Sequence, residues 1–448
     1  MTLLSETKKY QAYPKYENSG VDWLGSIPVG WKPTRLKHVV HINMGQSPNS
    51  DDCNIEGCGL PFLQGNAEFT SKSPQAKQFC PIPKKVAKKG ELLFSVRAPV
   101  GALNIADIDY GIGRGLCSLN NTNKVDTSFL WWLLPTYKFQ FDAIATGSTF
   151  EAVSAEQVGN LAFALPCIQQ QLQIASFLDH ETAKIDTLIE KQKQLIKLLK
   201  EKRQAVISHA VTKGLNSQAP MKDSGVEWLG EVPAHWSVTP LAGVADVIDP
   251  NPSHRNPKYT DDGFPFISTV EFTGIDNVEI NTPRRVAEET VLEQENRCNF
   301  QEGSIAFSRK GTIGAVRILP HGIRFALLDS VCVINCGETV LYEFLYQQCR
   351  SSLFESQLGA ETRGAALKQV SVGRVRAVKT FTPPLEEQKE ILAYLNEALS
   401  KLDKTVELAN KQVNYLTERR TALISAAVTG KIDVRNWQRP EVSKEEVA

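Results

Sequence analysis

The chain contains two copies of one unit. Residues 19–31 read SGVDWLGSIPVGW and residues 224–236 read SGVEWLGEVPAHW, with eight of thirteen positions identical. Residues 202–212, KRQAVISHAVT, and residues 419–429, RRTALISAAVT, share seven of eleven positions. Self-similarity at a period of roughly 200 residues indicates a duplicated architecture with internal pseudo-two-fold symmetry, and it argues against a single large domain.

Each copy ends in a segment that we expect to form one long helix, over 166–214 and over 383–431. Each segment opens with proline, whose fixed φ suits the first helical turn. Each also ends next to a glycine, Gly214 or Gly430, which can cap the last turn. The sequence therefore predicts two helices of nearly equal length, far longer than those of most globular domains.

Apolar residues recur along both segments at alternating steps of four and three. The stripes share one register, offset by 217 residues, and run through Ile185, Ile189, Ile196, Leu199, Val206 and Ala210, and through Leu402, Val406, Ala409, Val413, Leu416, Leu423 and Ala427. Arg203 and Arg420 interrupt the two stripes at the same slot. A sustained 3.5-residue repeat is typical of coiled coils, so we expect the helices to pair antiparallel. The alternative is two separate amphipathic helices, each on its own domain.

The order of the repeated pieces makes a prediction about the chain ends. The segment that begins at Ser224 follows Gly214 by ten residues, whereas the segment at Ser19 has no helix before it. If both copies pack alike, Ser19 lies near Gly430, within the ~35 Å that ten extended residues can span. We also expect Trp23, Trp31, Trp228 and Trp236 to pack the repeated segments against the helix ends.

The middles of the two copies, 36–165 and 240–382, have a different pattern. Short apolar runs such as ELLFSV and VCVINC are bounded by Gly, Pro, Asn and Asp, which is typical of strands and turns. We predict an α+β protein in which two β-rich domains are joined by two long antiparallel helices, with a polar tail at 436–448.

Composition and charge exclude several classes of protein. Fifty basic and fifty acidic side chains give no net charge, unlike a free-standing, non-specific nucleic-acid binder. The nine cysteines are scattered, and the first residues, MTLLSETKK, lack the apolar core of a signal peptide. We therefore expect reduced thiols and a soluble, cytoplasmic protein.

Catalytic signatures are missing from the sequence. No G-x-x-x-x-G-K-[ST] loop is present to bind nucleotide phosphates. GIGRG at 111–115 has the wrong spacing for a dinucleotide loop, so we interpret it as a tight turn near a strand. His38, His41, Cys53 and Cys58 follow no zinc-site spacing. We predict no catalytic residues, no cofactor and no metal site.

Taken together, these markers resemble the specificity (S) subunit of type I restriction–modification systems. The openings of the two helices, PCIQQQLQIASFLDHETAKID at 166–186 and PPLEEQKEILAYLNEALSKLD at 383–403, resemble a family pattern of proline, a Glu-Gln pair, Ile and Leu-Asp. The first copy departs from it at Cys167 and Gln170. The resemblance covers residues 15–435.

The resemblance implies a non-catalytic subunit that reads double-stranded DNA. One target-recognition domain would read each half of a bipartite, asymmetric site, and the helices would set the gap. Two methyltransferase (M) subunits, which carry S-adenosylmethionine, and restriction (R) subunits would be the partners. The implied division is 15–165 and 224–382 for the repeated segments with their recognition domains, 166–214 and 383–431 for the spacer helices, and 436–448 for the tail.

Loop position and side-chain chemistry then suggest which residues contact DNA. Gln and Asn can pair bidentately with adenine, and Arg with guanine. The candidates in the first domain are Gln46, Ser47, Asn49, Gln64, Asn66, Arg97, Ser148 and Thr149. The candidates in the second domain are Asn251, His254, Arg255, Ser268, Thr269, Arg309, Lys310, Thr362 and Arg363.

Two other functions fit parts of the sequence. A coiled-coil tether or adaptor with two ligand-binding β-rich domains and no DNA role agrees with the zero net charge. A self-sufficient methyltransferase fragment agrees less well, because the cofactor loop is missing. The absence of co-purification with a methyltransferase subunit would favour the tether or adaptor. Binding of S-adenosylmethionine by the isolated chain would favour the methyltransferase fragment.

Overall fold

The computed structural model describes most of the chain, in residues 10–49, 52–140, 152–226, 230–251, 257–274, 276–359 and 369–440. The chain divides into two compact units. Unit 1 comprises Met1–Lys191 and Gln412–Ala448, and unit 2 comprises Gln192–Lys411. Within the described residues, no helix is both long enough and apolar enough to cross a membrane.

Unit 1 contains two four-stranded sheets. The first is antiparallel, in the order β4 (Val40–Met44), β11 (Leu116–Asn121), β8 (Leu92–Ser95) and β9 (Leu103–Ile105). The second has the order β6 (Gln78–Cys80), β5 (Leu60–Leu63), β10 (Tyr110–Ile112) and β7 (Val86–Ala87), with β5 and β10 parallel. All four residues of β8 are buried, which matches the continuous apolar run ELLFSV.

Smaller elements complete unit 1. They are the pair β1 (Tyr16–Asn18) and β2 (Ser26–Pro28), the pair β3 (Lys32–Arg35) and β12 (Ala162–Leu165), and the helices α1 (Thr127–Thr136) and α3 (Ala155–Gly159). Asp126 caps α1, because its carboxylate accepts hydrogen bonds from the backbone N–H groups of Ser128 and Phe129. The apolar face of α1, which includes Phe129 and Leu133, packs in the main core of the unit.

Unit 2 repeats the antiparallel sheet and the parallel strand pair of unit 1. Its antiparallel sheet has the order β16 (Ala245–Ile248), β24 (Val331–Cys336), β21 (Ile305–Ser308) and β22 (Val316–Ile318). Its second sheet has the order β20 (Arg285–Val286), β17 (Tyr259–Ile267) and β23 (Ala326–Leu327), with β17 and β23 parallel. The pairs are β13 (Met221–Asp223) with β14 (Glu231–Pro233), β15 (Ser237–Pro240) with β25 (Lys379–Thr382), and β18 (Phe272–Thr273) with β19 (Asn277–Val278). The helices are α5 (Glu288–Cys298), α6 (Tyr342–Cys349), α7 (Ser352–Gly359) and α8 (Val372–Ala377).

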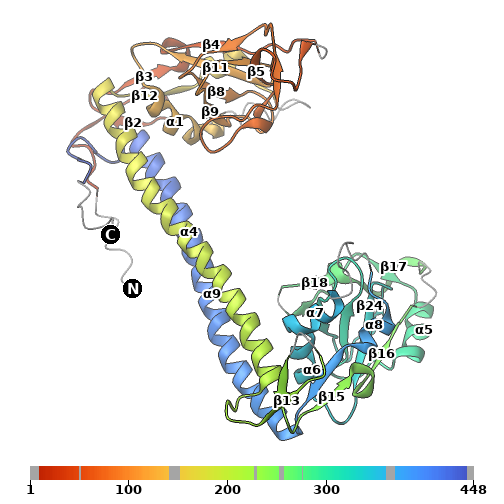
Figure 1. Ribbon diagram of the computed structural model, residues 1–448. Helices are drawn as coiled ribbons and strands as arrows, with labels where there is room; N and C mark the ends of the chain where they lie inside the picture. Colours follow the sequence, from red (N-terminus) through yellow and green to blue (C-terminus); the bar gives the residue numbers. More distant parts are fainter. Residues whose placement is uncertain are drawn as a thin grey trace. The chain divides into compact units, whose positions relative to one another are not determined.

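The two predicted long helices are present as α4 (Ile168–Lys213) and α9 (Leu385–Val428), and each passes from one unit into the other (Figure 1). Within unit 1, the first half of α4 lies along the second half of α9, where Ile174 and Phe177 share a core with Ala427. Within unit 2, the second half of α4 lies along the first half of α9, where Ile207 and Val211 share a core with Leu395. In each unit the two helices run in opposite directions.

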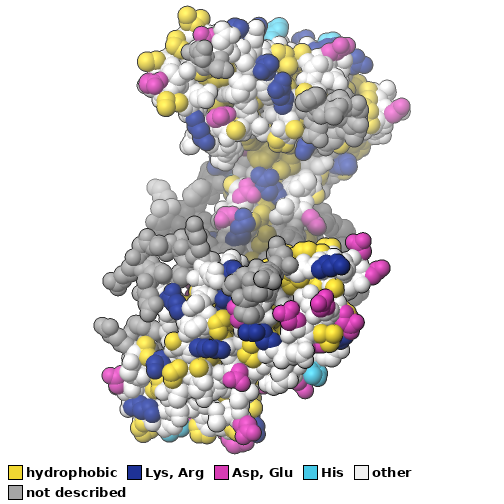
Figure 2. All heavy atoms as spheres, turned by 90° about the vertical axis from the view of Figure 1, so that its right-hand side faces the viewer, with side chains coloured by type: hydrophobic (Ala, Val, Ile, Leu, Met, Phe, Trp, Pro, Cys, Tyr) yellow, Lys and Arg dark blue, Asp and Glu magenta, His cyan; other side chains and the backbone are white. Residues whose placement is uncertain are grey.

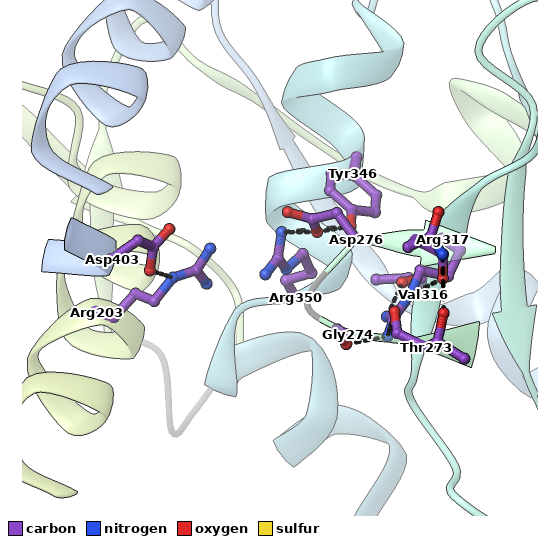
Figure 3. A network of polar contacts seen from close by, with 10 residues as sticks. Arg203, Thr273, Gly274, Asp276, Val316, Arg317, Tyr346, Arg350 and Asp403 are labelled. Carbon is purple, nitrogen blue, oxygen red and sulfur yellow. Dashed lines mark hydrogen bonds and ion pairs between the residues drawn. The ribbon is translucent and has the colours of Figure 1, made fainter. Parts of the chain in front are cut away.

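In each unit an arginine of one helix pairs with an aspartate of the other, and the two pairs are related by the repeat. In unit 1 the Arg420 Nε donates to Asp186 Oδ1 at 2.8 Å, and in unit 2 the Arg203 Nε donates to Asp403 Oδ1 at 3.1 Å (Figure 3). Asp186 and Asp403 are 217 residues apart in the sequence, and so are Arg203 and Arg420. The arginine side chains are 33% and 16% exposed, so each pair stabilises only modestly and mainly fixes register. Every position of the predicted stripes is buried or half-buried.

The helix ends are closed by the repeated segments. Gly214 and Gly430 adopt φ of +70° and +74°, the left-handed conformation that glycine allows at a helix C-terminus. Trp236 and Trp31, both buried, lie against these two glycines. The Tyr16 hydroxyl donates to the Gly430 carbonyl at 2.9 Å, which confirms that the segment around Ser19 lies at the end of α9.

Two expectations about aromatic residues need revision. Trp23 is 42% exposed, and the rings that its indole contacts are those of Tyr137 and Phe139, which lie outside α9. Trp228 lies outside the described residues. Trp437, in the predicted polar tail, packs edge-on against Phe177 of α4 with ring centroids 5.5 Å apart, and the tail is therefore anchored at this residue.

The two capping glycines predict unequal responses to alanine. A Cβ at either position is strained by the positive φ, at about 1–2 kcal/mol. At Gly430 it would also lie 2.5 Å from Pro28 Cγ, whereas at Gly214 the nearest atom, in Trp236, is 3.2 Å away. Overpacking adds about 1–3 kcal/mol, so calorimetry of the full chain should show a larger loss of stability for Gly430→Ala than for Gly214→Ala. Equal losses would contradict this packing.

Candidate nucleic-acid interface

Three loops of unit 1 meet where strands of its two sheets end. They follow β4 at Gln46, β5 at Gln64, and β10 at Gly113. The Gln46 N–H donates to the Ile112 carbonyl at 2.9 Å, and the Gly113 N–H donates to the Leu63 carbonyl at 2.8 Å. The parallel pairing of β5 with β10 and the antiparallel pairing of β4 with β11 therefore bring loops distant in sequence to one place.

Side chains from these loops contact one another and line a polar pocket. The Gln64 Nε2 donates to Ser47 Oγ at 2.8 Å, and the Arg114 backbone N–H donates to the same hydroxyl at 3.2 Å. The pocket has a volume of about 520 Å³ and is lined by Ser47, Pro48, Asn49, Cys53, Asn54, Ile55, Glu56, Phe62, Gln64, Gln78 and Arg114. Three of the residues predicted to contact DNA, Ser47, Asn49 and Gln64, thus share one site.

Glycine is required for this approach of the loops. A Cβ at Gly45 would lie 2.1 Å from the Gly113 carbonyl oxygen, and a Cβ at Gly113 would lie 2.6 Å from Gln64 Oε1. At Gly45 only glycine permits such a close backbone contact, whereas at Gly113 the nearest atom belongs to the flexible end of the Gln64 side chain. The GIGRG segment is thus the end of β10 and the turn into β11, and its glycines pack against neighbouring loops.

The other candidates of the first domain lie elsewhere. Gln46 is exposed but does not line the pocket. Asn66 begins a short 3-10 helix, Asn66–Glu68, and is half-buried. Arg97 is exposed and its backbone pairs with Ala152. Ser148 and Thr149 lie outside the described residues.

Two candidates of the second domain are buried in this structure, whereas a base contact needs an exposed side chain. The side chain of Arg309 is 3% exposed, and its guanidinium donates to Asp249 Oδ2 at 2.8 Å and to the Asp329 carbonyl at 2.7 Å. Ser268 is 2% exposed and caps the 3-10 helix Thr269–Glu271. Both side chains hold loops in place, and neither is exposed where a base could reach it.

Ser268 belongs to a buried ionic network. Its hydroxyl donates to Glu271 Oε2 at 3.0 Å, and the guanidinium of Arg284 donates to Glu271 Oε1 at 2.5 Å. Burial raises the pKa of the Glu271 carboxyl, but hydrogen bonds from Arg284, Ser268 and Thr282 outweigh it and hold the pKa below its ordinary value. The network therefore stabilises the fold at neutral pH.

The remaining second-domain candidates are accessible or undescribed. Lys310 is 31% exposed in its side chain, and its Nζ lies 2.5 Å from Asp329 Oδ2. Thr269 and Asn251 are half-buried. His254, Arg255, Thr362 and Arg363 lie outside the described residues.

The β-rich domain of each unit is fixed to the helices of the same unit. In unit 2, the Gln204 side chain of α4 donates to the Arg350 carbonyl, and the Arg350 guanidinium donates to Asp276 Oδ1 at 2.6 Å and lies over the Tyr346 ring (Figure 3). In unit 1, the Trp132 Nε1 of α1 donates to Asp179 Oδ1 of α4 at 2.9 Å. These contacts fix the orientation of each domain on its helix pair.

The surface charges agree with the zero net charge of the sequence. On the face that Figure 2 presents, basic and acidic side chains are interspersed. In the part of the chain that is described, no cluster of three or more His, Cys, Asp or Glu side chains could hold a metal ion. All nine cysteines are unpaired, and burial raises the pKa of Cys117 and Cys332 to about 12.

Sequence reasoning missed most of the pocket, including the polar residues Asn54, Glu56, Gln78 and Arg114. Arg114 was part of the GIGRG segment, which we interpreted only as a turn. An arginine between two glycines at the end of a strand was the available signal. Gln78 gave no signal, because its place in the pocket depends on the pairing of β6 with β5.

Comparison with known proteins identifies the family. The family model described as "Type I restriction modification DNA specificity domain" matches residues 28–198 and 233–418. A putative type I restriction enzyme MjaX specificity subunit of Methanocaldococcus jannaschii is 38% identical over 185 residues, which cover 40% of this chain and 43% of that protein. The EcoBI specificity subunit of Escherichia coli is 22% identical over 443 residues, covering 93% of this chain and 89% of that protein.

Solved structures show the same fold. A chain from a study of complex assembly and conformational transition in a type I restriction–modification system has a TM-score of 0.69 at 17% identity, and the match covers 91% of this chain and 99% of that chain. The HsdS subunit of Thermoanaerobacter tengcongensis has a TM-score of 0.50 at 17% identity, over 91% and 98% of the two chains. Since the family model matches both repeats and most of the sequence, the chain belongs to the family of type I restriction–modification DNA specificity proteins.

Proposed function

We propose that the chain reads a bipartite, asymmetric DNA site, with the β-rich domain of unit 1 on one half-site and that of unit 2 on the other. As a member of the specificity family, the chain recognises DNA sequence and is not itself the enzyme of the system. Methylation and cleavage would be carried out by partner subunits.

This proposal rests on one observation: the two β-rich domains share their main sheet order but differ in the side chains of their loops. The sheet order β4-β11-β8-β9 recurs as β16-β24-β21-β22, and a parallel strand pair accompanies each sheet. At the end of the first strand of that pair, unit 1 has the exposed Gln64 and unit 2 the buried Ser268. Equivalent scaffolds whose loops carry different exposed side chains predict two unlike half-sites.

The helices α4 and α9 would act as an antiparallel coiled-coil spacer. In this division, 15–165 and 224–382 hold the repeated segments and recognition domains, while 166–214 and 383–431 form the spacer. Two domains that read one side of a duplex place their half-sites about one helical turn, ~10 bp, apart. The matched pairs Arg203–Asp403 and Arg420–Asp186 support a fixed register and therefore a fixed gap.

The partners would be double-stranded DNA, two M subunits and, in the full complex, R subunits. S-adenosylmethionine would bind to M and not to this chain, and the complex would work in the cytoplasm. A chain with no net charge attracts phosphates weakly on its own, so shared DNA contacts with M would supply much of the salt-dependent affinity.

Co-purification tests this assignment against the tether alternative. The full chain is co-expressed with the M subunit of a type I system from the same genome, with a β-rich control protein of similar size in its place. We expect this chain, and not the control, to bring down M and to confer sequence-specific DNA binding on the complex. A chain that folds but retains neither M nor DNA would favour the tether.

A further inference from the structure

Arg114 of unit 1 and Asp329 of unit 2 occupy the same place in the two domains. Each lies in the three-residue turn between equivalent strands, β10 to β11 and β23 to β24. In the first turn the Gly113 N–H donates to the Leu63 carbonyl at 2.8 Å, and in the second the Leu328 N–H donates to the Ile267 carbonyl at 2.9 Å. The backbone of the two turns is therefore equivalent.

The chemistry at this position is opposite in the two domains. The Asp329 carboxylate pairs with Lys310, and its carbonyl accepts from Arg309. Arg114 is exposed, and among the described residues its guanidinium has no hydrogen-bond or ion-pair partner. The turn of unit 2 thus carries the carboxylate of Asp329, which is already paired. The turn of unit 1 carries the guanidinium of Arg114, a permanently charged planar donor that is available to bind a ligand.

Arg114 is held on a rigid backbone. Its neighbours Gly113 and Gly115 pack so tightly on Gln64 and Gly65 that an added Cβ would lie within 2.6 and 2.7 Å of an atom of Gln64. Its own N–H donates to Ser47 Oγ at 3.2 Å. Placing this donor against a ligand therefore costs little backbone entropy, and the cost that remains is the ordering of the arginine side chain.

We propose that Arg114 is a specificity-determining residue that reads a guanine in the half-site of unit 1. Arginine donates bidentately to O6 and N7 of guanine in the major groove. Gln64, Gln78 and Asn49 line the same pocket and carry the amides that pair with adenine. The exposed Arg97 does not line the pocket, which favours Arg114 for this role. The inference rests on the proposed assignment of one domain to each half-site.

The experiment uses the complex of this chain with its M subunits and a DNA pool randomised in both half-sites. We expect Arg114→Ala to lower the preference for one G·C pair of one half-site by about tenfold or more, which is the range of a bidentate contact. Arg114→Lys, which keeps the charge without the planar fork, should keep at most part of this preference. The exposed Lys84, outside the pocket, provides the matched control, and Lys84→Ala should leave every base preference unchanged.

Several results would overturn the inference. If Arg114→Ala weakens binding equally for all sequences and Arg114→Lys behaves as wild type, Arg114 contacts phosphate. If neither variant changes any preference, Arg114 has no reading role. If Arg114→Ala lowers the melting temperature of the complex, Arg114→Lys and Arg114→Gln become the deciding variants. A change in both half-sites would instead refute the division of one domain per half-site.

Discussion

Exchanging residues 36–165 for the corresponding segment of another family member should change one half of the methylated sequence and leave the other half unchanged. The expected change is complete, because all reading loops of unit 1 lie in this segment and its core is separate from that of unit 2. A changed base pair costs about 1–3 kcal/mol, so several changes abolish recognition of the original half-site. Sequencing of methylated adenines gives the result directly.

The second domain provides the matched control for this exchange. Replacing residues 240–382 should change the other half of the site alone. An exchange that altered both halves, or neither, would show that the domains do not read DNA independently. A chimera that does not co-purify with M has lost assembly, and it is left out of the comparison of methylated sequences.

Removing one heptad from each long helix should shorten the unread gap and leave both half-sites unchanged. The register of the two ion pairs places 191–197 opposite 409–415, so deleting both segments keeps Arg203 opposite Asp403 and Asp186 opposite Arg420. Seven residues at 1.5 Å correspond to about 10 Å, or roughly three base pairs of duplex. Methylation should then move to sites with the shorter gap.

A one-sided deletion is the control for the spacer. Removing 191–197 alone shifts α4 against α9 and separates the charged partners, so we expect loss of methylation at every gap length. If the paired deletion left the gap as it was, the helices would not determine the spacing.

The long helices and the closure at Gly430 could be predicted because their signals are local or repeated. A 3.5-residue stripe needs only the sequence, and a duplicated segment locates its partner by analogy. The role of Arg309 could not be predicted, since its partner Asp249 becomes a neighbour only through tertiary structure. The capping role of Ser268 did have a local signal, because Ser268 and Glu271 are spaced as in a capping box. Both residues follow strands, where an exposed loop position was the natural expectation.

The pocket of unit 1 shows the same limit. Its predicted members Ser47 and Gln64 are 17 residues apart, but Arg114 joins them only because β10 pairs in parallel with β5. Non-local strand pairing leaves no periodic signal in a sequence, so the glycines around Arg114 appeared to mark a turn and nothing more. Their close packing against Gln64 gives them a second role.

The most direct test of the central claim is a genome-wide map of methylated adenines in the host, made with and without this gene. The account predicts the loss of one motif consisting of two unlike half-sites separated by an unread gap, with half-site centres about 10 bp apart. The M gene remains intact in both strains, so the loss must come from recognition. A map that is unchanged without the gene, or a lost motif that is continuous or palindromic, would contradict it.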